Sequence, residues 1–260
     1  MNENEKIAAA AYFEGIMSVR AVIRGGELGI NNRKIEAVYI DKAAKKSKMR
    51  ELSYLNKKKD KLGFEIKFVD REIIDGLSVG TSHGGIIAKC SDRQFKCTLP
   101  DTLDDKRFFV MLDGIEDPFN FGYALRSLYA FGADAVILPE RNWMSAASIV
   151  CRSSAGASEL CDIYSVEPVA AVEHLKKLGA TIIATAKENS ESIANIEISS
   201  PLLLIIGGEK RGISKKILSL ADNTVRIDYS RNFLSSLSAA SAAAILGYEI
   251  SNRLIDLEKK

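Results

Sequence analysis

Residues 112–138 read LDGIEDPFNFGYALRSLYAFGADAVIL, and this stretch predicts a strand, a helix and a second strand in succession. The first apolar strand ends at Asp113 and is followed by a polar turn. Asp117 and Pro118 then predict a helix start, because Asp favours the capping position and Pro the first helical position. The second strand begins near Ala135. The stretch therefore indicates an α/β protein.

The helix in this stretch carries an amide at Asn120 and a guanidinium at Arg126. Arg126 has Ala124, Leu125 and Leu128 as sequence neighbours, so we expect its charge to lie in apolar surroundings. A charge desolvated in this way needs an anion, or a ligand that brings one. Asn120 and Arg126 are therefore the first candidates for a functional site.

From Arg107 onward the alternation of strands and helices continues. Helical segments separate apolar runs that begin at Phe108, Ala135, Thr181, Leu202 and Thr224. Unbroken apolar runs separated by helices indicate a parallel sheet that is covered on both faces. A last helix, rich in small residues at its start, is expected from about Ser236 to Glu258.

The first hundred residues predict a smaller α/β module. We expect helices over Phe13–Arg24, from about Lys42 to Lys61 and from Arg71, and strands from Ile35, Phe64 and Ile86. The polar segment Ser91–Lys106 contains Pro100 and several aspartates, which is typical of a linker. These boundaries give a first domain of residues 1–92, a linker of residues 93–106 and a second domain of residues 107–260.

The charge of the chain is divided unevenly between its two parts. The 260 residues carry a net charge of +2, but residues 1–100 hold 19 Lys/Arg against 13 Asp/Glu, whereas the remainder holds 17 against 21. A basic amino-terminal unit joined to a mildly acidic one suggests a module that binds a polyanion. The hydrophobic fraction of 47% and the charged fraction of 27% are ordinary for a soluble globular protein.

Cysteine and histidine usage argues against metal or disulfide chemistry. Cys90, Cys97, Cys151 and Cys161 form no CxxC pair and have no histidine beside them. We therefore expect no metal, and reduced, mostly buried thiols in a cytoplasmic protein. The start of the chain does not resemble a signal peptide, and no apolar run approaches the roughly 20 residues that a membrane span needs.

The segment from Lys42 to Lys61 holds nine Lys/Arg and two acidic residues. One interpretation is a surface that contacts phosphates, and the other is a solvated helix surface, which is the commoner meaning of an isolated Lys-rich helix. His83, in the Gly-flanked loop SVGTSHGG, either contacts RNA or caps a turn. The candidate phosphate contacts are Lys45, Lys46, Lys48 and Arg50.

Two further segments of the second half are candidates for a ligand site. LLLIIGGEKRGISKKIL, from Leu202, places the turn Gly207–Gly212 between a strand and a helix cap at Ser214. Glycine after a strand lets backbone groups approach a ligand closely, although an ordinary strand-to-helix connection has the same pattern. Neither the Walker spacing nor GxGxxG is present, so nicotinamide or flavin binding has no support. VRIDYSRNFLSSLSAASAAAILGYEI, from Val225, begins a helix with small residues that allow close packing.

Taken together, the three segments resemble the SpoU (TrmH-like) RNA 2′-O-ribose methyltransferases of the SPOUT superfamily. Two motifs of that family run Asn-x-Gly-x-x-x-Arg and Gly-x-Glu-x-x-Gly. The residues that match them are Asn120, Gly122, Arg126, Gly207, Glu209 and Gly212. The third motif is matched at Ser236, Leu237 and the later Tyr248-Glu249. The stretch SSAGASE at residues 153–159 and the amino-terminal stretch, which is similar to the family's substrate-binding domain, extend the resemblance over nearly the whole chain.

This resemblance implies a small amino-terminal α/β RNA-binding domain and a carboxyl-terminal parallel-sheet domain with a deep trefoil knot. It also implies S-adenosylmethionine as cofactor, RNA as substrate and a homodimer with its active site near the subunit interface. The implied catalytic residues are Asn120, Arg126, Glu209 and Ser238, and the implied cofactor-binding residues are Thr185, Gly207, Gly212, Ile227 and Leu237. The implied RNA-binding residues are Lys45, Lys46, Lys48, Arg50 and His83.

The third motif departs from the family, because Ser238 replaces the usual Asn and Ala240 the usual Ser. A hydroxyl is shorter than an amide and lacks its second polar group, which bears on rate and target choice. Two hypotheses follow. One is a methyltransferase that acts on ribosomal RNA, with transfer RNA as the alternative and an antibiotic-resistance role left open. The other is a non-catalytic RNA-binding or assembly protein on the same fold.

Overall fold

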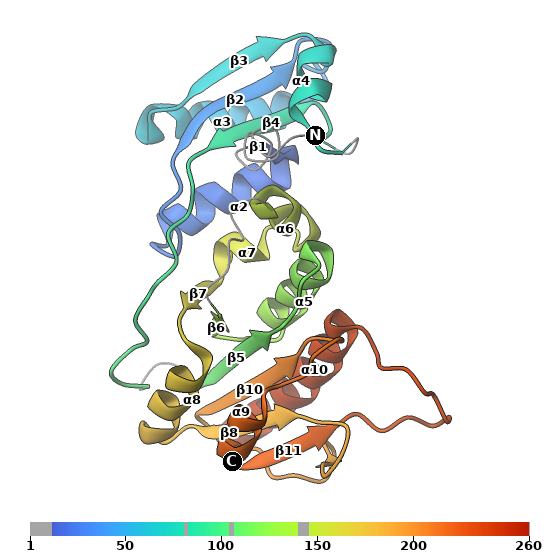
Figure 1. Ribbon diagram of the computed structural model, residues 1–260. Helices are drawn as coiled ribbons and strands as arrows, with labels where there is room; N and C mark the ends of the chain where they lie inside the picture. Colours follow the sequence, from blue (N-terminus) through green and yellow to red (C-terminus); the bar gives the residue numbers. More distant parts are fainter. Residues whose placement is uncertain (1–11, 81–82, 104–106, 140–145, 260) are drawn as a thin grey trace. The chain divides into compact units, whose positions relative to one another are not determined.

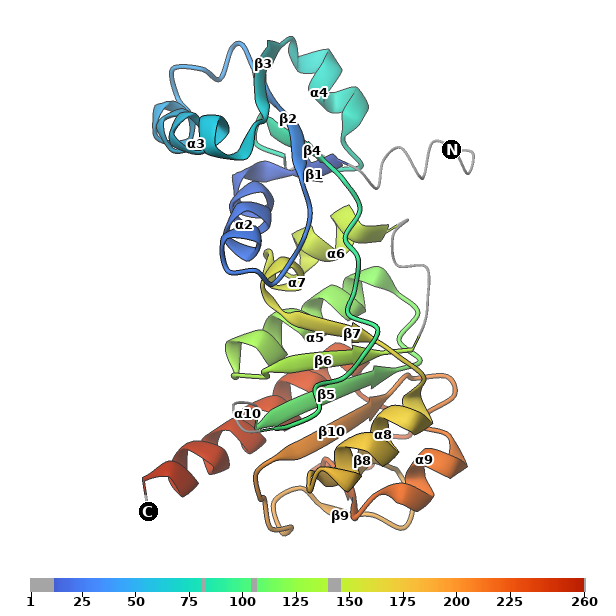
Figure 2. The same cartoon turned by 90° about the vertical axis from the view of Figure 1, so that its left-hand side faces the viewer.

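The computed structural model describes residues 12–80, 83–103, 107–139 and 146–259. Contacts divide the chain into two compact units, whose elements are labelled in Figures 1 and 2. One unit comprises residues up to Gln94 together with Asn142–Leu160, and the other comprises Phe95–Arg141 together with Cys161–Lys260. The described residues 146–160 therefore pack with the unit that ends at Gln94, while the domain limits 1–92, 93–106 and 107–260 stay a prediction. Thr81, Ser82, Asp104 and Asp105 of the expected loop and linker lie outside the described residues.

The first unit is built on a four-stranded sheet of order β1-β4-β2-β3. Strands β2 and β3 are parallel and the other pairs are antiparallel, so the sheet is mixed. Helices α2, α3 and α6 contribute side chains to one buried core with this sheet. Its elements are β1 (Tyr12–Glu14), α2 (Gly15–Glu27), β2 (Ile35–Asp41), α3 (Met49–Leu62), β3 (Glu65–Val69), α4 (Arg71–Leu77), β4 (Ile86–Cys90), α6 (Ala147–Ser153) and α7 (Ala157–Leu160).

Two helix starts in this unit differ from the sequence prediction. Phe13 lies in β1 rather than in the first helix, because its fully buried ring faces the core and its backbone pairs with β4. The basic helix begins at Met49 and not at Lys42, and residues 42–48 form turns. The first apolar side chains at helical spacing here are Leu52 and Leu55, which are buried, so earlier residues have no apolar face to pack.

A buried ion pair fastens α7 to the sheet of the first unit. Nε of Arg33 donates to Oε2 of Glu159 at 2.9 Å, and the two side chains are only 3% and 2% exposed. The same guanidinium donates to the carbonyl of Ser91 at 2.9 Å and lies 4.8 Å from the ring centre of Phe13. Asn31 donates to the backbone carbonyl of Glu159 at 3.0 Å. These contacts explain why residues distant in sequence belong to one unit.

The second unit is built on a seven-stranded sheet of order β7-β6-β5-β10-β8-β11-β9 in which every pair is parallel. Helices α8 and α9 pack together on one face, and α5 packs with α10 on the other (Figure 2). The strands are β5 (Phe108–Asp113), β6 (Ala135–Leu138), β7 (Asp162–Ser165), β8 (Thr181–Thr185), β9 (Glu191–Ser192), β10 (Leu202–Gly207) and β11 (Asn223–Arg226). The helices are α5 (Pro118–Ala130), α8 (Pro168–Lys177), α9 (Lys215–Leu220) and α10 (Ala239–Glu258).

The predicted α/β class, the covered parallel sheet and the five predicted strands of the second half are confirmed. The short strands β7 and β9 were not predicted, because four and two residues carry little periodic signal. Within the described ranges, none of the helices is both long and apolar enough to span a bilayer.

Candidate active site

The carboxyl ends of four neighbouring strands create the candidate site. Strands β5, β10, β8 and β11 are adjacent in the sheet and parallel, so their ends at Asp113, Gly207, Thr185 and Arg226 lie along one edge. In open parallel sheets, ligands bind at this edge, where the loops after the strands converge. The edge therefore brings together all three segments that the sequence singles out.

The turns that follow β5 and β10 touch each other through backbone. The N–H of Gly208 donates to the carbonyl of Asp113 at 2.6 Å. A Cβ at position 208 would lie 2.1 Å from the carbonyl oxygen of Gly114, so only glycine fits there. Lys210 adds an ion pair of 3.0 Å with Glu116. The first and second segments are thus joined both by backbone and by side chains.

The turn Gly207–Gly212 is closed on itself and bonded to β8. The N–H of Gly207 donates to Oγ1 of Thr185 at 3.3 Å, and the N–H of Gly212 donates to the carbonyl of Gly208 at 2.9 Å. A Cβ at Gly207 would come within 2.9 Å of the carbonyl carbon of Gly212, so this packing also depends on glycine. Three of the expected cofactor-binding residues, Thr185, Gly207 and Gly212, are therefore neighbours.

The third segment meets the second at the start of α10. Oε1 of Glu209 accepts a hydrogen bond of 3.2 Å from the N–H of Ala239. Ser238 is the N-cap of the helix, and its hydroxyl accepts from the N–H of Ser241 at 3.2 Å. The N–H of Leu237 donates to the hydroxyl of Tyr229 at 3.0 Å. Ile227, the remaining expected cofactor-binding residue, directly follows β11 and is half-buried.

Asn120 and Arg126 lie on α5, whose start has the predicted cap. The side chain of Asp117 accepts from the N–H groups of Phe119 and Asn120, and Pro118 is the first helical residue. Asn120 is half-buried.

The expected desolvation of Arg126 is wrong, because Arg126 is exposed whereas its neighbours Ala124, Leu125 and Leu128 are buried. Successive helix residues point about 100° apart, so sequence neighbours do not share a face. Arg126 consequently offers its guanidinium to solvent or to a bound anion.

The candidate RNA contacts gather at one end of the first unit's sheet. Lys45, Lys46 and Arg50 are exposed and Lys48 is half-buried, in and just after the turns that follow β2. These turns lie against the loop before β4: the N–H of Asp41 donates to the carbonyl of Gly85 at 2.9 Å. A Cβ on Gly84 would lie 3.9 Å from Nζ of Lys48. Lys48 thus lies beside the Gly-rich loop, and the four residues Lys45, Lys46, Lys48 and Arg50 are together called the basic surface.

His83 has a local role in that loop. Its side chain is 1% exposed. Nδ1 accepts from the N–H of Gly85 at 3.1 Å, so Nε2 carries the proton and donates to Asp75 at 2.9 Å. The ring thus caps a turn, as one of the two interpretations expected. Its contact with RNA stays a prediction, and a contact through the ring would require this turn to open.

Sequence reasoning did not identify Tyr229, Gly208 or the Glu116–Lys210 pair. Gly208, Glu116 and Lys210 act through a partner on another segment, and Tyr229 acts through Leu237, eight residues later in its own loop; no local spacing predicts these partners. Sequence analysis also did not single out the contact between Arg20 of α2 and Tyr54 of α3, in which the guanidinium lies 5.0 Å from the ring centre. The signal that could have found Arg20 is a hydrophobic stripe that places α2 and α3 on the same face of the sheet.

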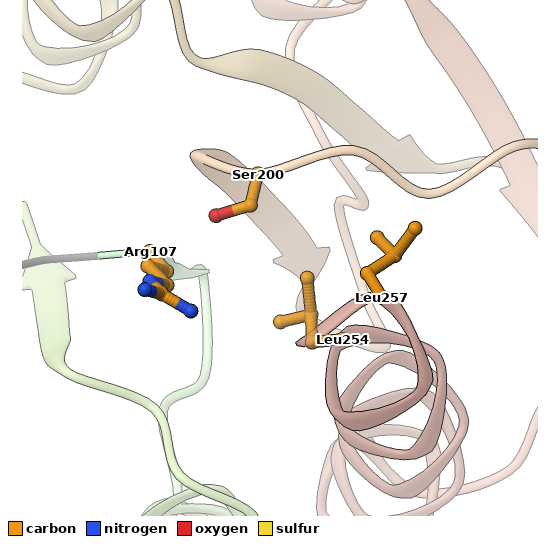
Figure 3. Close-up of a pocket in the computed structure, with 4 residues that line it drawn as sticks. All are labelled: Arg107, Ser200, Leu254 and Leu257. Carbon is orange, nitrogen blue, oxygen red and sulfur yellow. The ribbon is translucent and has the colours of Figure 1, made fainter. Parts of the chain in front are cut away.

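A separate hollow of about 630 Å³ lies at the opposite end of the parallel strands. Arg107 and Ser200, which come just before β5 and β10, line it together with Leu254 and Leu257 of α10 (Figure 3). None of the expected site residues is among these four. The hollow therefore does not belong to the candidate active site.

The thiols and carboxylates of the described residues offer no cluster that could hold a metal ion. Cys90, Cys151 and Cys161 are buried, Cys97 is exposed, and none of these four described residues forms a disulfide. Burial raises the pKa of Cys151 to about 12 and that of Cys90 well above its ordinary value. Burial therefore favours the neutral, unreactive thiol at Cys90 and Cys151.

Comparison with known protein families gives two matches that together cover most of the chain. The profile of the SpoU rRNA Methylase family matches residues 107–248. A second profile, described as RNA 2′-O ribose methyltransferase substrate binding, matches residues 14–96. The candidate active site falls within the first match, and the basic surface falls within the second.

Curated relatives carry related names. The chain is 27% identical to YacO of Bacillus subtilis, provisionally named a TrmH family tRNA/rRNA methyltransferase, over 85% of this chain and 89% of that protein. It is 29% identical to the 23S rRNA (guanosine-2′-O-)-methyltransferase RlmB of Shewanella oneidensis, over 72% of this chain and 78% of that protein.

Solved structures share the fold at low sequence identity. The AdoMet-bound rRNA methyltransferase of Sinorhizobium meliloti is 20% identical and matches 96% of this chain and 94% of its own with a TM-score of 0.76. The AviRb methyltransferase of Streptomyces viridochromogenes, in complex with AdoMet, is 21% identical. The match covers 98% of this chain and 99% of that chain, with a TM-score of 0.70.

Proposed function

The chain belongs to the SpoU rRNA methylase family, and from that premise we propose that it methylates ribose 2′-hydroxyls of ribosomal RNA with S-adenosylmethionine as the methyl donor. The observation that carries this proposal is the meeting of three segments at one sheet edge. Gly208 bonds to Asp113, and Glu209 bonds to Ala239, so hydrogen bonds link the three segments that carry the motifs.

The strand ends supply a suitable surface for the cofactor. Thr185 and Gly207 are the last residues of β8 and β10. Ile227 follows β11, and Leu237 lies just before the N-cap of α10. Gly212 closes the turn that begins at Gly207. Backbone groups at these positions suit a ligand that is recognised mainly by hydrogen bonds to the main chain. When bound, S-adenosylmethionine supplies a methyl group on a strongly activating sulfonium.

The chain's own residues would align the ribose and help its hydroxyl to lose a proton. Positioning of reacting groups contributes several kcal/mol to such a transfer. Arg126 is exposed, so it can hold a phosphate of the target nucleotide and favour the developing alkoxide. Asn120 and Glu209 would orient the ribose and its hydrogen-bond network, with Glu209 as the candidate proton acceptor.

The basic surface of the first unit would bind the RNA substrate. Lys45, Lys46, Lys48 and Arg50 lie within the part of the chain that matches the substrate-binding profile. The proposed contacts are with phosphates, because lysine and arginine neutralise the backbone without reading sequence. Ribosomal RNA is favoured over transfer RNA because the relative RlmB is named as a 23S rRNA methyltransferase and the matching family is described as SpoU rRNA Methylase.

We also propose a homodimer, a trefoil knot near the carboxyl end and a cytoplasmic location. The dimer is supported by large apolar side chains exposed on the paired helices α5 and α10, namely Phe119, Tyr123, Ile245 and Tyr248. An exposed apolar face of this kind is typical of a protein interface. Two copies related by a two-fold axis could bury this face. Arg126 lies on α5, one of the two helices that carry it.

The second candidate function is a non-catalytic RNA-binding or assembly protein. It is favoured by Ser238, whose hydroxyl already accepts the N–H of Ser241 as a helix cap and is 3.0 Å from the hydroxyl of Ser241. Ala240 offers no polar group at all. Calorimetry separates the two functions, because an assembly protein would show no binding of S-adenosylmethionine at millimolar concentration. Increased methylation by Ser238→Asn would show that the departure limits the rate.

The test of the proposed function is methyl transfer to defined RNA. The purified protein is incubated with radiolabelled S-adenosylmethionine and with unmodified ribosomal or transfer RNA. The methylated nucleotide is then mapped. We expect label at a ribose 2′-oxygen of ribosomal RNA. Label on a base, or on transfer RNA alone, would overturn the corresponding part of the proposal. Mapping 2′-O-methyl sites in cells with and without the protein identifies the nucleotide.

A further inference from the structure

The loop of residues 227–238 connects β11 to α10 and extends away from the sheet, drawn in red in Figure 1. Its large apolar side chains are mostly exposed to solvent: Phe233 is 56% and Leu234 is 93% exposed. Ordering a segment costs conformational entropy, and this loop recovers little of that cost by burial. Specific contacts are therefore needed to hold its two ends where the cofactor-binding backbone is expected.

Tyr229 makes one such contact across the loop. Its hydroxyl accepts a hydrogen bond of 3.0 Å from the N–H of Leu237. Its ring lies 6.1 Å from the ring of Phe233 at an angle of 58°, a tilted arrangement that aromatic pairs favour. The side chain of Tyr229 thus ties the outgoing arm of the loop to the arm that returns to α10.

The residue that Tyr229 holds lies directly before the helix cap. The N–H groups of Leu237, Ala239 and Ser241 each have a side-chain acceptor, supplied by Tyr229, Glu209 and Ser238 respectively. Glu209 comes from the turn after β10, whereas Tyr229 and Ser238 belong to the loop itself. The conformation of Leu237 therefore depends on one hydroxyl.

We propose that Tyr229 is a positioning residue of the cofactor pocket, whose hydroxyl fixes the backbone of Leu237 for binding S-adenosylmethionine. This inference rests on the proposed function and deepens it. Tyr229 acts through Leu237 and takes no part in methyl transfer. Its loss weakens cofactor binding and leaves the rate at saturating cofactor unchanged, because the reacting groups stay in place once the cofactor is bound.

The variant Tyr229→Phe tests this role, since it removes the hydroxyl and keeps the ring beside Phe233. Calorimetry on the full chain should show a Kd for S-adenosylmethionine raised about five- to tenfold, the usual effect of removing one hydrogen bond. KM for the cofactor should rise by a similar factor while kcat stays within about twofold. Amide hydrogen exchange at Leu237 should become faster, a readout that does not depend on activity.

A matched control is Tyr129→Phe, which makes the same change at an exposed tyrosine of α5 and should leave Kd unaltered. A parent-like Kd for Tyr229→Phe, or a fall in kcat at unchanged KM, overturns the role of Tyr229. The two proposals fail differently. If the parent chain binds no S-adenosylmethionine, both fail; if the parent and Tyr229→Phe bind it equally, only the role of Tyr229 fails.

Discussion

Glu209 and Ala239 are joined by a hydrogen bond of 3.2 Å from the backbone N–H of Ala239 to the carboxylate. Ala239 is the first residue of the 20-residue helix α10, so the acid of the second motif lies against the positive end of a long helix. The bond links the loop after β10 to the start of α10, and hence two of the three parts of the site. Glu209 has this anchoring role whether or not it also contacts substrate.

Substitutions of Glu209 separate anchoring from proton transfer. Glu209→Gln keeps an oxygen that accepts from Ala239, so we expect cofactor affinity within about twofold of the parent. Glu209→Ala removes the acceptor, and cofactor affinity should fall about five- to tenfold. If Glu209 accepts the ribose proton, Glu209→Gln also loses about 10²-fold or more in kcat. Calorimetry and single-turnover methylation measure the two effects, and equal affinity in all three proteins would exclude the anchor.

Local chemistry predicted the starts of α5 and α9, whereas burial and contacts between strands could be seen only in the fold. Asp117 and Ser214 were identified as caps from sequence, and both accept the expected N–H groups, because capping involves residues within one turn. The predicted burial of Arg126 was wrong, because burial depends on which face of α5 packs on the sheet. The need for glycine at Gly208 follows from the pairing of β5 with β10, which chain order does not reveal.

The basic surface should make the affinity for RNA depend on salt concentration. Lys45→Ala combined with Lys46→Ala removes two exposed charges from the turns after β2, while the proposed reacting groups belong to the second unit. The slope of log K against log salt for RNA binding should become shallower by roughly 0.7 to 0.9 for each phosphate that the variant no longer neutralises. Fluorescence anisotropy at several salt concentrations measures this slope. The matched pair Lys215→Ala and Lys216→Ala on α9 should leave it unchanged, and an equal change in both pairs would contradict a specific surface.

The Arg33–Glu159 ion pair should be costly to break. Glu159→Ala leaves the guanidinium of Arg33 buried and without its carboxylate, which we expect to lower the free energy of unfolding by about 3–5 kcal/mol. Urea unfolding followed by circular dichroism measures the change. Glu65→Ala, which removes a solvent-exposed partner of Lys67 in the same unit, is the control and should have no measurable effect. Similar midpoints for the two variants would show that α7 is not held by this pair.

Thiol reactivity should follow burial. In the native protein, only the exposed Cys97 should react quickly with a disulfide reagent, and all four thiols should react in denaturant. Cys151 has its folded-state pKa raised from 9.0 to about 12 by burial, so its contribution to stability is full below pH 9. That contribution is lost as pH rises from 9 toward 12, because the unfolded chain then releases the proton first. Two or more fast thiols at neutral pH would contradict the buried positions.

Arg126 provides the sharpest test of the site, because its exposure separates catalysis from folding. Arg126→Ala removes a side chain that packs in no core, so the free energy of unfolding should change by less than about 0.5 kcal/mol. Cofactor affinity should stay at the parent value. Methyl transfer should fall about 10²-fold or more, because the phosphate and the developing negative charge lose their cation.

Arg126→Lys refines this result, since lysine keeps the charge but not the planar pair of donors that grips a phosphate. Partial activity in Arg126→Lys would indicate that charge alone carries part of the effect, and activity as low as in Arg126→Ala would indicate that two-point binding is required. Lys177→Ala on α8 is the control for removing an exposed cation. Parent-like methylation by Arg126→Ala would remove Arg126 from the site, whereas loss of folding would mean that its role is structural.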